Sequence, residues 1–182
     1  MSEKYKFNDP EGIYFVTTTV VGWVDLFTRP ELKHVIIDSL QYCQKQKGLI
    51  IHAWCIMPSH LHLITSTKGE PLSSILRDFK KFTAKELVKV IERIHESRKG
   101  WLLDFFMDVA NGLNRVNDYK VWQDGNHPLL LSTNKMLEQK LDYLHDNPVV
   151  AEIVDEPEEY RYSSARDYYT KKKGLLEIVF IE

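Results

Sequence analysis

The stretch Met57-Pro58-Ser59-His60-Leu61-His62-Leu63-Ile64 tells more about the fold than any other part of the chain. Successive side chains of a β-strand point to opposite faces, so His60 and His62 share one face and Leu61 and Leu63 share the other. We expect the leucines to enter the core and the two imidazoles to lie close enough to bind one metal ion. The competing interpretation is two polar residues on an exposed strand, because so short a histidine pattern also arises by chance.

Strands and helices are predicted in alternation along the rest of the sequence. Runs of β-branched and aromatic residues indicate strands, and apolar residues three and four positions apart indicate helices. Pro58 and Ser59 join two strands tightly enough for a hairpin. Ser132 or Thr133 is expected to cap the last helix, and Pro148 to end it. The predicted elements are strands over 13–21, 49–57, 61–66 and 119–123, helices over 30–47, 72–94 and 134–147, and a short extra strand over 175–181.

The order strand, helix, strand, strand, helix, strand, helix predicts an α+β fold. It corresponds to the ferredoxin-like (RRM-like) split βαβ plan, an antiparallel sheet packed by helices, here with an added C-terminal helix. In that plan the first and third strands occupy the middle of the sheet. Residues 100–118 are harder to assign, since an apolar, helix-like half is followed by an asparagine-rich half. No internal repeat or linker divides the chain, so we expect one domain over residues 1–182.

The composition is that of a soluble globular protein. Of the 182 residues, 43% are hydrophobic and 27% are charged, which are ordinary proportions for a folded domain. No segment approaches the roughly 18 consecutive apolar residues of a membrane span, and the polar N-terminus lacks the apolar stretch of a signal peptide. The two cysteines, Cys43 and Cys55, are too few for a disulfide scaffold. We therefore expect reduced thiols, a cytoplasmic protein and no membrane partner.

The charged residues are unevenly distributed. The net charge of −2 argues against a protein that coats DNA generally. However, eight basic and four acidic residues lie between Arg77 and Lys99, whereas residues 152–159 contain five acidic residues and no basic one. A protein with segregated charges can bind a polyanion on one face while it stays near neutral overall.

A second group of candidate residues lies on the predicted helix over 134–147. Positions four apart share a helix face, and Tyr143 and Asn147 form such a pair. A tyrosine hydroxyl is a poor nucleophile at neutral pH because its pKa is roughly 10, but a divalent metal that polarises a phosphoryl oxygen can compensate. Asn147 can offer a neutral oxygen to the same metal. Taken alone, Tyr143 is more simply explained as a half-buried aromatic residue that packs on the sheet.

Several other residues are candidates for contact with nucleic acid. Lys80, Lys81 and Lys85 lie on the basic helix and are expected to contact phosphates, which would make binding depend on salt. A solvated helix face is the alternative for each lysine. Trp122 and Gln123, at the end of the predicted fourth strand, are candidates to stack on a base or to bind its edge. Core packing is the alternative for Trp122.

Taken together, these patterns resemble the single-tyrosine HUH transposases, and more closely their REP-associated tyrosine transposase branch. The resemblance covers most of the chain. Its most specific part is the stretch Met57–Leu63 followed, about 80 residues later, by Asp142–Val149. The matching segments are Tyr14–Thr17, Ala53–His62, Phe79–Thr83, Val121–Gln123, Asp142–Val149 and Tyr162–Ser164.

The resemblance implies that the chain cuts and rejoins single-stranded DNA. Tyr143 would be the nucleophile, and His60, His62 and Asn147 would hold Mg²⁺ or Mn²⁺. Attack by Tyr143 would leave a 5′-phosphotyrosine and release a 3′-hydroxyl, which can reverse the step or join new ends. Many relatives carry glutamine where this chain has Asn147, and His145 is the alternative third ligand, although helical spacing favours Asn147. By the same resemblance, the DNA is expected to contain a hairpin and the protein to form a homodimer.

Two other functions fit the sequence. The first is a DNA-binding protein of the same fold that has lost catalysis and serves its host, although all three expected catalytic positions are present. The second is an RNA-binding ferredoxin-like domain. Such a domain would carry exposed aromatic residues on its central strands, where this sequence has histidines.

Overall fold

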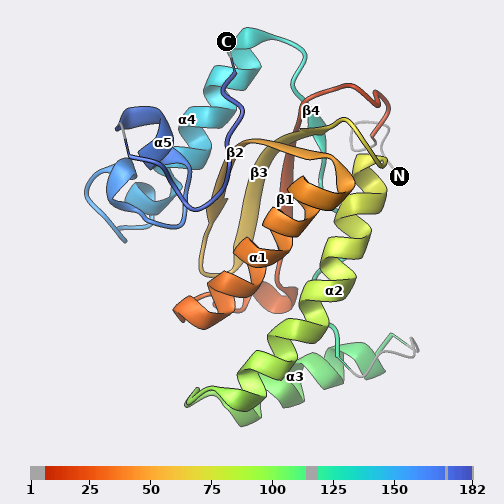
Figure 1. The fold of residues 1–182 in the computed structure, drawn as a ribbon. Helices are drawn as coiled ribbons and strands as arrows, with labels where there is room; N and C mark the ends of the chain where they lie inside the picture. Colours follow the sequence, from red (N-terminus) through yellow and green to blue (C-terminus); the bar gives the residue numbers. More distant parts are fainter. Residues whose placement is uncertain (1–6, 114–118, 171, 182) are drawn as a thin grey trace.

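Four strands and their covering helices build the α+β fold that the sequence predicts (Figure 1). The computed structural model describes residues 7–113, 119–170 and 172–181. Within them the strands are β1 (Tyr14–Thr19), β2 (Leu49–Ile56), β3 (His60–Thr67) and β4 (Leu129–Leu130). The helices are α1 (Pro30–Lys47), α2 (Leu72–Arg93), α3 (Lys99–Asn111), α4 (Asn134–Val150) and α5 (Ala165–Tyr169), with the short 3₁₀ turns η2 (Val21–Trp23) and η3 (Pro157–Glu159).

The strands form one antiparallel sheet in the order β2-β3-β1-β4. β1 and β3 occupy its middle, which confirms the prediction for the first and third strands. Their register places Thr17 opposite His62 and Thr19 opposite His60. β2 and β3 form the expected tight hairpin, in which the Met57 N–H donates to the His60 carbonyl over 2.8 Å. The ferredoxin-like arrangement is therefore present.

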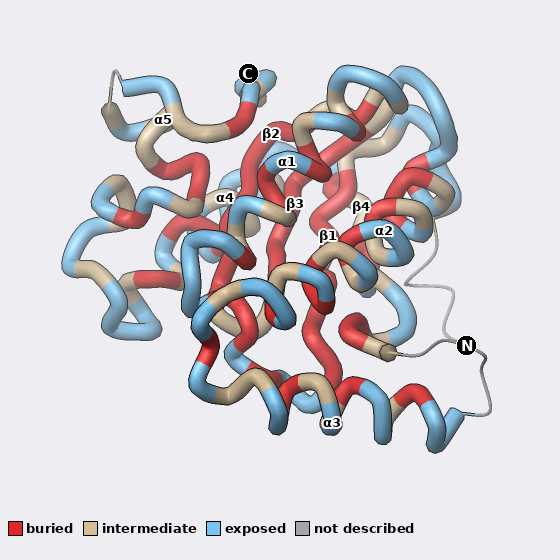
Figure 2. The backbone as a smooth tube through the Cα atoms, turned by 60° about the horizontal axis from the view of Figure 1, so that its bottom comes forward, coloured by how far each residue is buried: buried red, intermediate tan, exposed pale blue. Residues whose placement is uncertain are grey.

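Helices cover both faces of this sheet (Figure 1, Figure 2). On one face α1 and α2 pack against Val16, Leu61 and Leu63 in the larger hydrophobic core. On the other face Leu144 of α4 packs in a smaller core that contains Phe15. Because side chains alternate along a strand, the histidines of β3 lie on the α4 face, opposite the two leucines. The orientation predicted for the leucines is thus confirmed.

The fourth strand lies later in the chain than predicted. Residues 119–123 form no strand: Trp122 makes a single bridge to Val20, and the edge strand is β4 instead. The Lys80 ammonium explains the difference, because it binds the carbonyl oxygens of Gln123 and Gly125, at 2.5 and 2.7 Å. These carbonyls therefore face a side chain of α2 and not a neighbouring strand. We call residues 119–126, which run between α2 and β1, the strap.

α4 continues past Pro148 to Val150, whereas the sequence predicts its end at Asn147. Proline lacks the N–H that a helix uses and disfavours helical backbone in the residue before it. Here the lost hydrogen bond is confined to the last turn, and Pro148 is buried, so tertiary packing outweighs the local preference. The N–H groups of Ala151 and Ile153 donate to the carbonyls of Asn147 and Pro148 and close the helix end.

Other predicted segments can be compared with the structure. Residues 175–181 form no strand, although the Val179 N–H donates to the Ile51 carbonyl at the edge of β2 over 3.0 Å. Within the stretch 100–118, residues up to Asn111 belong to α3, and 114–118 lie outside the described residues. Thr133 caps α4, since its side chain accepts the Met136 N–H. In the described parts of the chain, no helix combines the length and apolar character needed to cross a membrane.

Candidate active site

His60 and His62 lie side by side near the start of β3. Their ring centroids are 4.6 Å apart. A hydroxyl holds the Nδ1 atom of each ring: Thr17 Oγ1 lies 2.9 Å from His62 Nδ1, and Ser59 Oγ lies 3.0 Å from His60 Nδ1. A partner that fixes one ring nitrogen orients the other toward its ligand, as in many metal sites. The arrangement leaves the Nε2 atom of each ring for a further partner.

The surroundings of the two histidines suit a metal ion. His62 is 4% exposed, and its Nε2 atom is buried without a hydrogen-bond partner among the described residues. An orphaned buried nitrogen costs roughly 1–3 kcal/mol, which a ligand would recover. Burial lowers the pKa of His60 to about 4 and the pKa of His62 to about 3. Both rings are therefore neutral near pH 7, which is the form that binds metals.

A metal held by two histidines needs further ligands. Within the described residues, no three His, Cys, Asp or Glu side chains gather in a way that could hold one. Asn147 donates its amide to the Tyr143 carbonyl over 3.3 Å, which leaves its side-chain oxygen for a ligand. The ring nitrogens of buried His145 lie 3.1 Å from Tyr169 Oη and 2.8 Å from Ser164 Oγ. The structure therefore does not bring His145 to the histidine pair.

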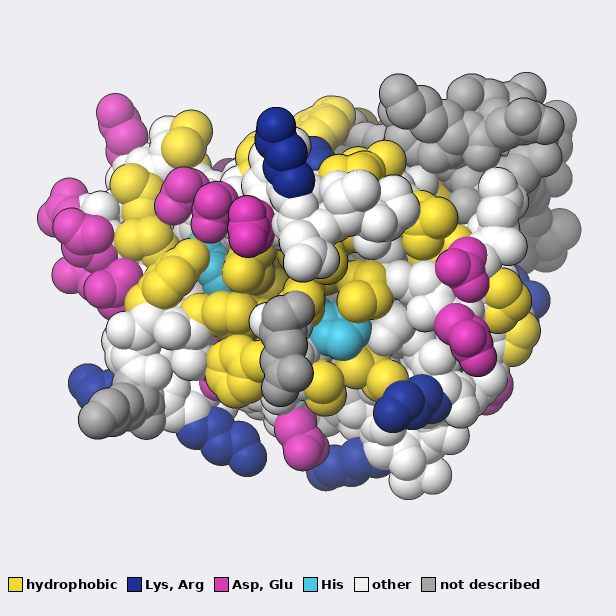
Figure 3. Space-filling view, turned by 90° about the horizontal axis from the view of Figure 1, so that it is seen from above, with side chains coloured by type: hydrophobic (Ala, Val, Ile, Leu, Met, Phe, Trp, Pro, Cys, Tyr) yellow, Lys and Arg dark blue, Asp and Glu magenta, His cyan; other side chains and the backbone are white. Residues whose placement is uncertain are grey.

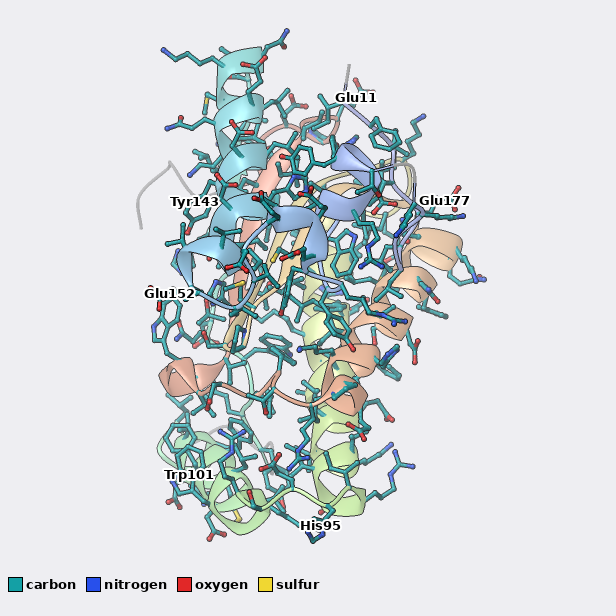
Figure 4. The ribbon with its side chains drawn as sticks, turned by 90° about the vertical axis from the view of Figure 1, so that its left-hand side faces the viewer. Glu11, His95, Trp101, Tyr143, Glu152 and Glu177 are labelled. Atoms are coloured by element: carbon teal, nitrogen blue, oxygen red, sulfur yellow. The ribbon has the colours of Figure 1, made fainter. Side chains whose placement is uncertain are left out.

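Tyr143 stands on α4 beside the histidine pair, and Figure 4 shows its place on that helix. Its ring centroid lies 5.5 Å from that of His62 and 6.0 Å from that of Phe15. The side chain is 49% exposed, so a large substrate can reach it. The Lys140 ammonium lies 5.1 Å from the centre of the Tyr143 ring. A tyrosine hydroxyl, a cation and two neutral imidazoles thus meet within one chain.

The lysines predicted to contact phosphates differ in their surroundings. Lys81 and Lys85 are exposed, and neither forms an ion pair with a residue that the structure describes. Lys80 is partly buried and holds the strap carbonyls, and burial lowers the pKa of its ammonium to about 8. The ammonium groups of Lys81 and Lys85 are therefore available to a phosphate. The ammonium group of Lys80 is occupied by the strap carbonyls.

Trp122 and Gln123 attach the strap to the rest of the protein. Trp122 is 4% exposed, and its indole N–H donates to Thr83 Oγ1 over 2.9 Å, so core packing describes it better than base stacking. The Gln123 N–H donates to the Thr19 carbonyl over 2.8 Å, and its side chain also binds main chain just after β1. Since Thr19 pairs with His60, two strand spacings, about 10 Å, separate the strap from the histidine pair.

A basic groove of about 820 Å³ runs between α2 and the strap. Arg77, Lys81, Lys85 and Lys89 line it, and all four are exposed. They are spaced four residues apart, so they follow one side of α2 at intervals of about 6 Å. Lys120, which pairs with Asp124 at 2.9 Å, lines the groove from the strap. A line of positive charge of this kind suits a phosphate backbone.

Sequence reasoning missed four residues around the histidines. Thr17 and Ser59 hold the rings, but only the strand register shows that Thr17 faces β3. Lys140 precedes Tyr143 by three residues, so helical spacing could have placed it on the same face. Trp23 comes from the turn after β1, and its ring centroid lies 5.6 Å from that of the first histidine. No periodic pattern in the sequence indicates this last contact.

A comparison with known protein families gives the class of this chain, a transposase. The model of the family described as "Transposase IS200 like" matches residues 23–119, more than half of the chain. The chain therefore belongs to the IS200-like transposase family, as the sequence resemblance indicates. The matched segment contains both histidines and ends before α4. No curated protein matches the chain.

Two solved structures are similar to this one. The REP-associated tyrosine transposase bound to a REP hairpin has a TM-score of 0.62 and 22% sequence identity, and the likeness covers 100% of this chain and 95% of that chain. A Deinococcus radiodurans R1 protein assigned as a transposase has a TM-score of 0.44 and 14% identity, over 79% of this chain and 98% of its own. The first likeness shows the shared α+β fold.

Proposed function

We propose that the chain is a metal-dependent transposase that nicks and rejoins single-stranded DNA through a 5′-phosphotyrosine. The observation that carries this proposal is the position of Tyr143, whose ring lies 5.5 Å from that of His62 in the same chain. The unpartnered Nε2 atom of His62 offers a metal ligand beside it. The solved structure of similar fold holds a REP hairpin, which supports hairpin-containing DNA as the substrate.

The chemistry is an exchange of one phosphoester for another. Tyr143 Oη attacks the scissile phosphorus and loses its proton, the bond from phosphorus to O3′ breaks, and the departing O3′ takes up a proton. The phosphate stays on Tyr143, so no external energy is consumed and the 3′-hydroxyl can reverse the step. Lys140, next to the Tyr143 ring, is placed to offset the negative charge of the phosphate.

His60, His62 and the side-chain oxygen of Asn147 would hold the metal. Thr17 and Ser59 would keep the two rings oriented through their Nδ1 atoms. When bound, Mg²⁺ or Mn²⁺ polarises a phosphoryl oxygen and offsets the charge that develops during attack. Mixed nitrogen and oxygen ligands suit either ion.

The basic groove would lead the DNA strand toward these residues. Lys81 and Lys85 would contact its phosphates directly, and Lys80 would act by holding the strap. Gln123, partly exposed on the strap, is the candidate to meet the edge of a base, and Trp122 would support it from the core. The strap lies about 10 Å from the histidine pair, roughly three stacked nucleotides.

A covalent adduct tests the proposal. Wild-type protein is incubated with a labelled single-stranded hairpin oligonucleotide and Mg²⁺ or Mn²⁺, and the mixture is run on a denaturing gel. We expect a protein–DNA band that EDTA abolishes. Tyr143→Phe should lose the band and still bind DNA, because only one exposed hydroxyl is removed. Nicking by Tyr143→Phe at the wild-type rate would contradict the assignment of the nucleophile.

The same gel separates the competing functions. His60→Ala should lose the band, and Asn147→Gln should keep more of it than Asn147→Ala, because glutamine offers the same amide oxygen. Folded wild-type protein that binds the oligonucleotide without an adduct would indicate a DNA-binding protein without catalysis. Preference for an RNA oligonucleotide of the same sequence would indicate the RNA-binding alternative.

A further inference from the structure

A tight turn after β1 places a tryptophan in an unfavourable backbone conformation. The turn is η2, in which Gly22 has a φ of 64° and Trp23 a φ of 56°. Two consecutive residues in the left-handed region form a mirror-image turn, in which Gly, Asn and Asp are preferred. A large aromatic residue is uncommon there. Trp23 therefore occupies a position that the backbone alone would give to another residue type.

Helix α3 fixes this turn from one side. A Cβ atom added at Gly22 would lie 2.7 Å from the Phe105 ring, so only glycine fits and the turn rests on α3. The chain must then continue through Trp23 in the same left-handed conformation. Glycine or asparagine would adopt it at a lower cost than tryptophan. The fold thus gives no reason for a tryptophan at this position.

Packing gives no reason either. Trp23 is 61% exposed, whereas an indole kept for its hydrophobic contacts is largely buried. The ring does meet His60 edge to face, with centroids 5.6 Å apart and planes at 72°. Its open surface therefore adjoins the residue that would hold the metal. A strained, exposed side chain beside a catalytic group is a common mark of a functional contact.

We propose that Trp23 is a stacking platform for a base of single-stranded DNA next to the scissile phosphate. Its position relative to that phosphate rests on the proposed function, but stacking itself requires only DNA binding. An indole stacks on any base, because every base has a π-face. A stacked base would fix the orientation of its nucleotide, and hence the direction from which the phosphate meets Tyr143. The turn holds the ring away from the core, where a base can reach it.

Variants that keep the backbone and remove the ring test this proposal. Trp23→Gly and Trp23→Asn both tolerate the left-handed turn, so they should melt at or above the temperature of the parent protein. The parent is Tyr143→Phe, and the probe is a fluorescein-labelled DNA hairpin with a single-stranded tail. Affinity should fall about five-fold to about a hundred-fold in both variants, the range expected for one stacked base. Trp23→Phe should keep most of the affinity.

A matched control separates stacking from a general loss of exposed aromatic surface. Tyr42 is 58% exposed on α1, which covers the opposite face of the sheet. Tyr42→Ala should leave the affinity unchanged. If Tyr42→Ala weakens binding as much as Trp23→Gly does, the platform at Trp23 is not specific and the proposal fails.

An abasic nucleotide moved along the tail locates the base. With the parent protein, one abasic position should weaken binding about as much as Trp23→Gly does. At that position, Trp23→Gly combined with the abasic nucleotide should weaken DNA binding no further than either change alone, because both remove the same contact. Unchanged affinity in both ring-less variants, or equal effects at every abasic position, would overturn the proposal. No cleavage is needed, so the result stands even if wild-type protein forms no covalent adduct.

Discussion

His145 fastens the tyrosine helix to the sheet through one hydroxyl group. Its Nε2 atom lies 2.8 Å from Ser164 Oγ, and the same hydroxyl accepts the backbone N–H of Trp54 over 3.0 Å. Trp54 belongs to β2, the neighbour of the strand that carries the histidine pair. His145 is fully buried and lies two residues after Tyr143. We therefore expect it to position the tyrosine without touching the substrate.

Replacement of His145 by alanine should separate this role from that of a metal ligand. Ser164 and Tyr169 each lose the hydrogen bond to the imidazole and a buried volume is emptied, so the free energy of unfolding should fall by about 2–3 kcal/mol in urea titrations. Adduct formation should slow, whereas Mn²⁺ affinity measured by calorimetry should persist, because the two histidines of β3 are intact. A parallel loss of Mn²⁺ affinity would make His145 the third ligand instead.

Single residues were predictable where their role depends on local spacing. Strand alternation placed His60 and His62 on one face, and Leu61 and Leu63 in the core. Thr17 and Trp23 were not predictable, because a strand register and an irregular turn bring them to the histidines. Trp122 was predicted with two alternatives, and the hydrogen bond of its buried indole favours the packing role.

A buried carboxylate holds the junction between α2 and α3. The Glu96 side chain is 2% exposed and pairs with Arg29 at 3.1 Å and with Arg98 at 3.3 Å. The Arg98 backbone N–H also donates to it over 3.0 Å. This N–H, together with the Arg29 and Arg98 side chains, lowers the pKa of Glu96 to about 2 from its ordinary 4.5. The start of α1 and the α2–α3 junction are thereby joined.

Glu96→Gln should destabilise the protein in a pH-dependent way. The folded-state pKa is depressed, so the stabilisation is present above pH 4.5 and is lost as the pH falls toward 2. At pH 7 the variant should lose about 1.5–3 kcal/mol, the usual contribution of hydrogen bonds to a charged group. Urea titrations of both proteins at several pH values should show the difference narrowing below pH 4.5. A difference that does not change with pH would mean that the charge contributes nothing.

Helices and strands were predictable where one periodic pattern decides them. α1 and α2 have the predicted bounds within one residue. Residues 119–123 were predicted as the fourth strand, but the ammonium of Lys80, 43 residues before Gln123, binds the Gln123 carbonyl, and no strand forms there. α4 continues past Pro148 because burial of that residue outweighs the tendency of proline to end a helix. The sequence assigned no role to the residues of α3. In the structure, Phe105 of α3 packs against the turn at Gly22.

Acidic side chains are concentrated at one end of the molecule. Figure 3 shows acidic side chains gathered at the end of the molecule that carries α5, in agreement with the five acidic residues of 152–159. The basic groove lies between α2 and the strap. Although the net charge is −2, the groove is therefore a locally positive surface of the kind that attracts a polyanion.

The groove should account for much of the salt dependence of DNA binding. Each phosphate contact to a single strand contributes about 0.7 to the slope of log K against log salt, so Lys81→Ala with Lys85→Ala should reduce the slope by about 1.4. Fluorescence anisotropy of a single-stranded oligonucleotide at several salt concentrations measures this slope. Lys45→Ala with Lys68→Ala removes two exposed lysines outside the groove and should leave it almost unchanged. Equal slopes for the two double variants would mean that the DNA does not bind along the groove.

One chain contains a complete set of the proposed catalytic residues. β4 ends at Leu130 and α4 begins at Asn134, so the connection can span at most about 14 Å. α4 then packs on its own sheet, where Leu144 shares a core with Phe15. For Tyr143 to serve a second copy, this core would have to open. The predicted homodimer is a separate matter, since two copies can associate while each keeps its own site.

A mixture of two inactive variants tests whether Tyr143 serves the histidines of its own chain. His60→Ala lacks a metal ligand and Tyr143→Phe lacks the nucleophile, so neither should form an adduct alone. We expect the mixture to form none at any protein concentration, because the short connection before α4 and its buried face keep Tyr143 on its own sheet. If α4 served a partner, mixed assemblies would regain one complete site. The adduct would then appear on the His60→Ala chain, which still carries the tyrosine, and tagging that chain to shift its mobility would identify it.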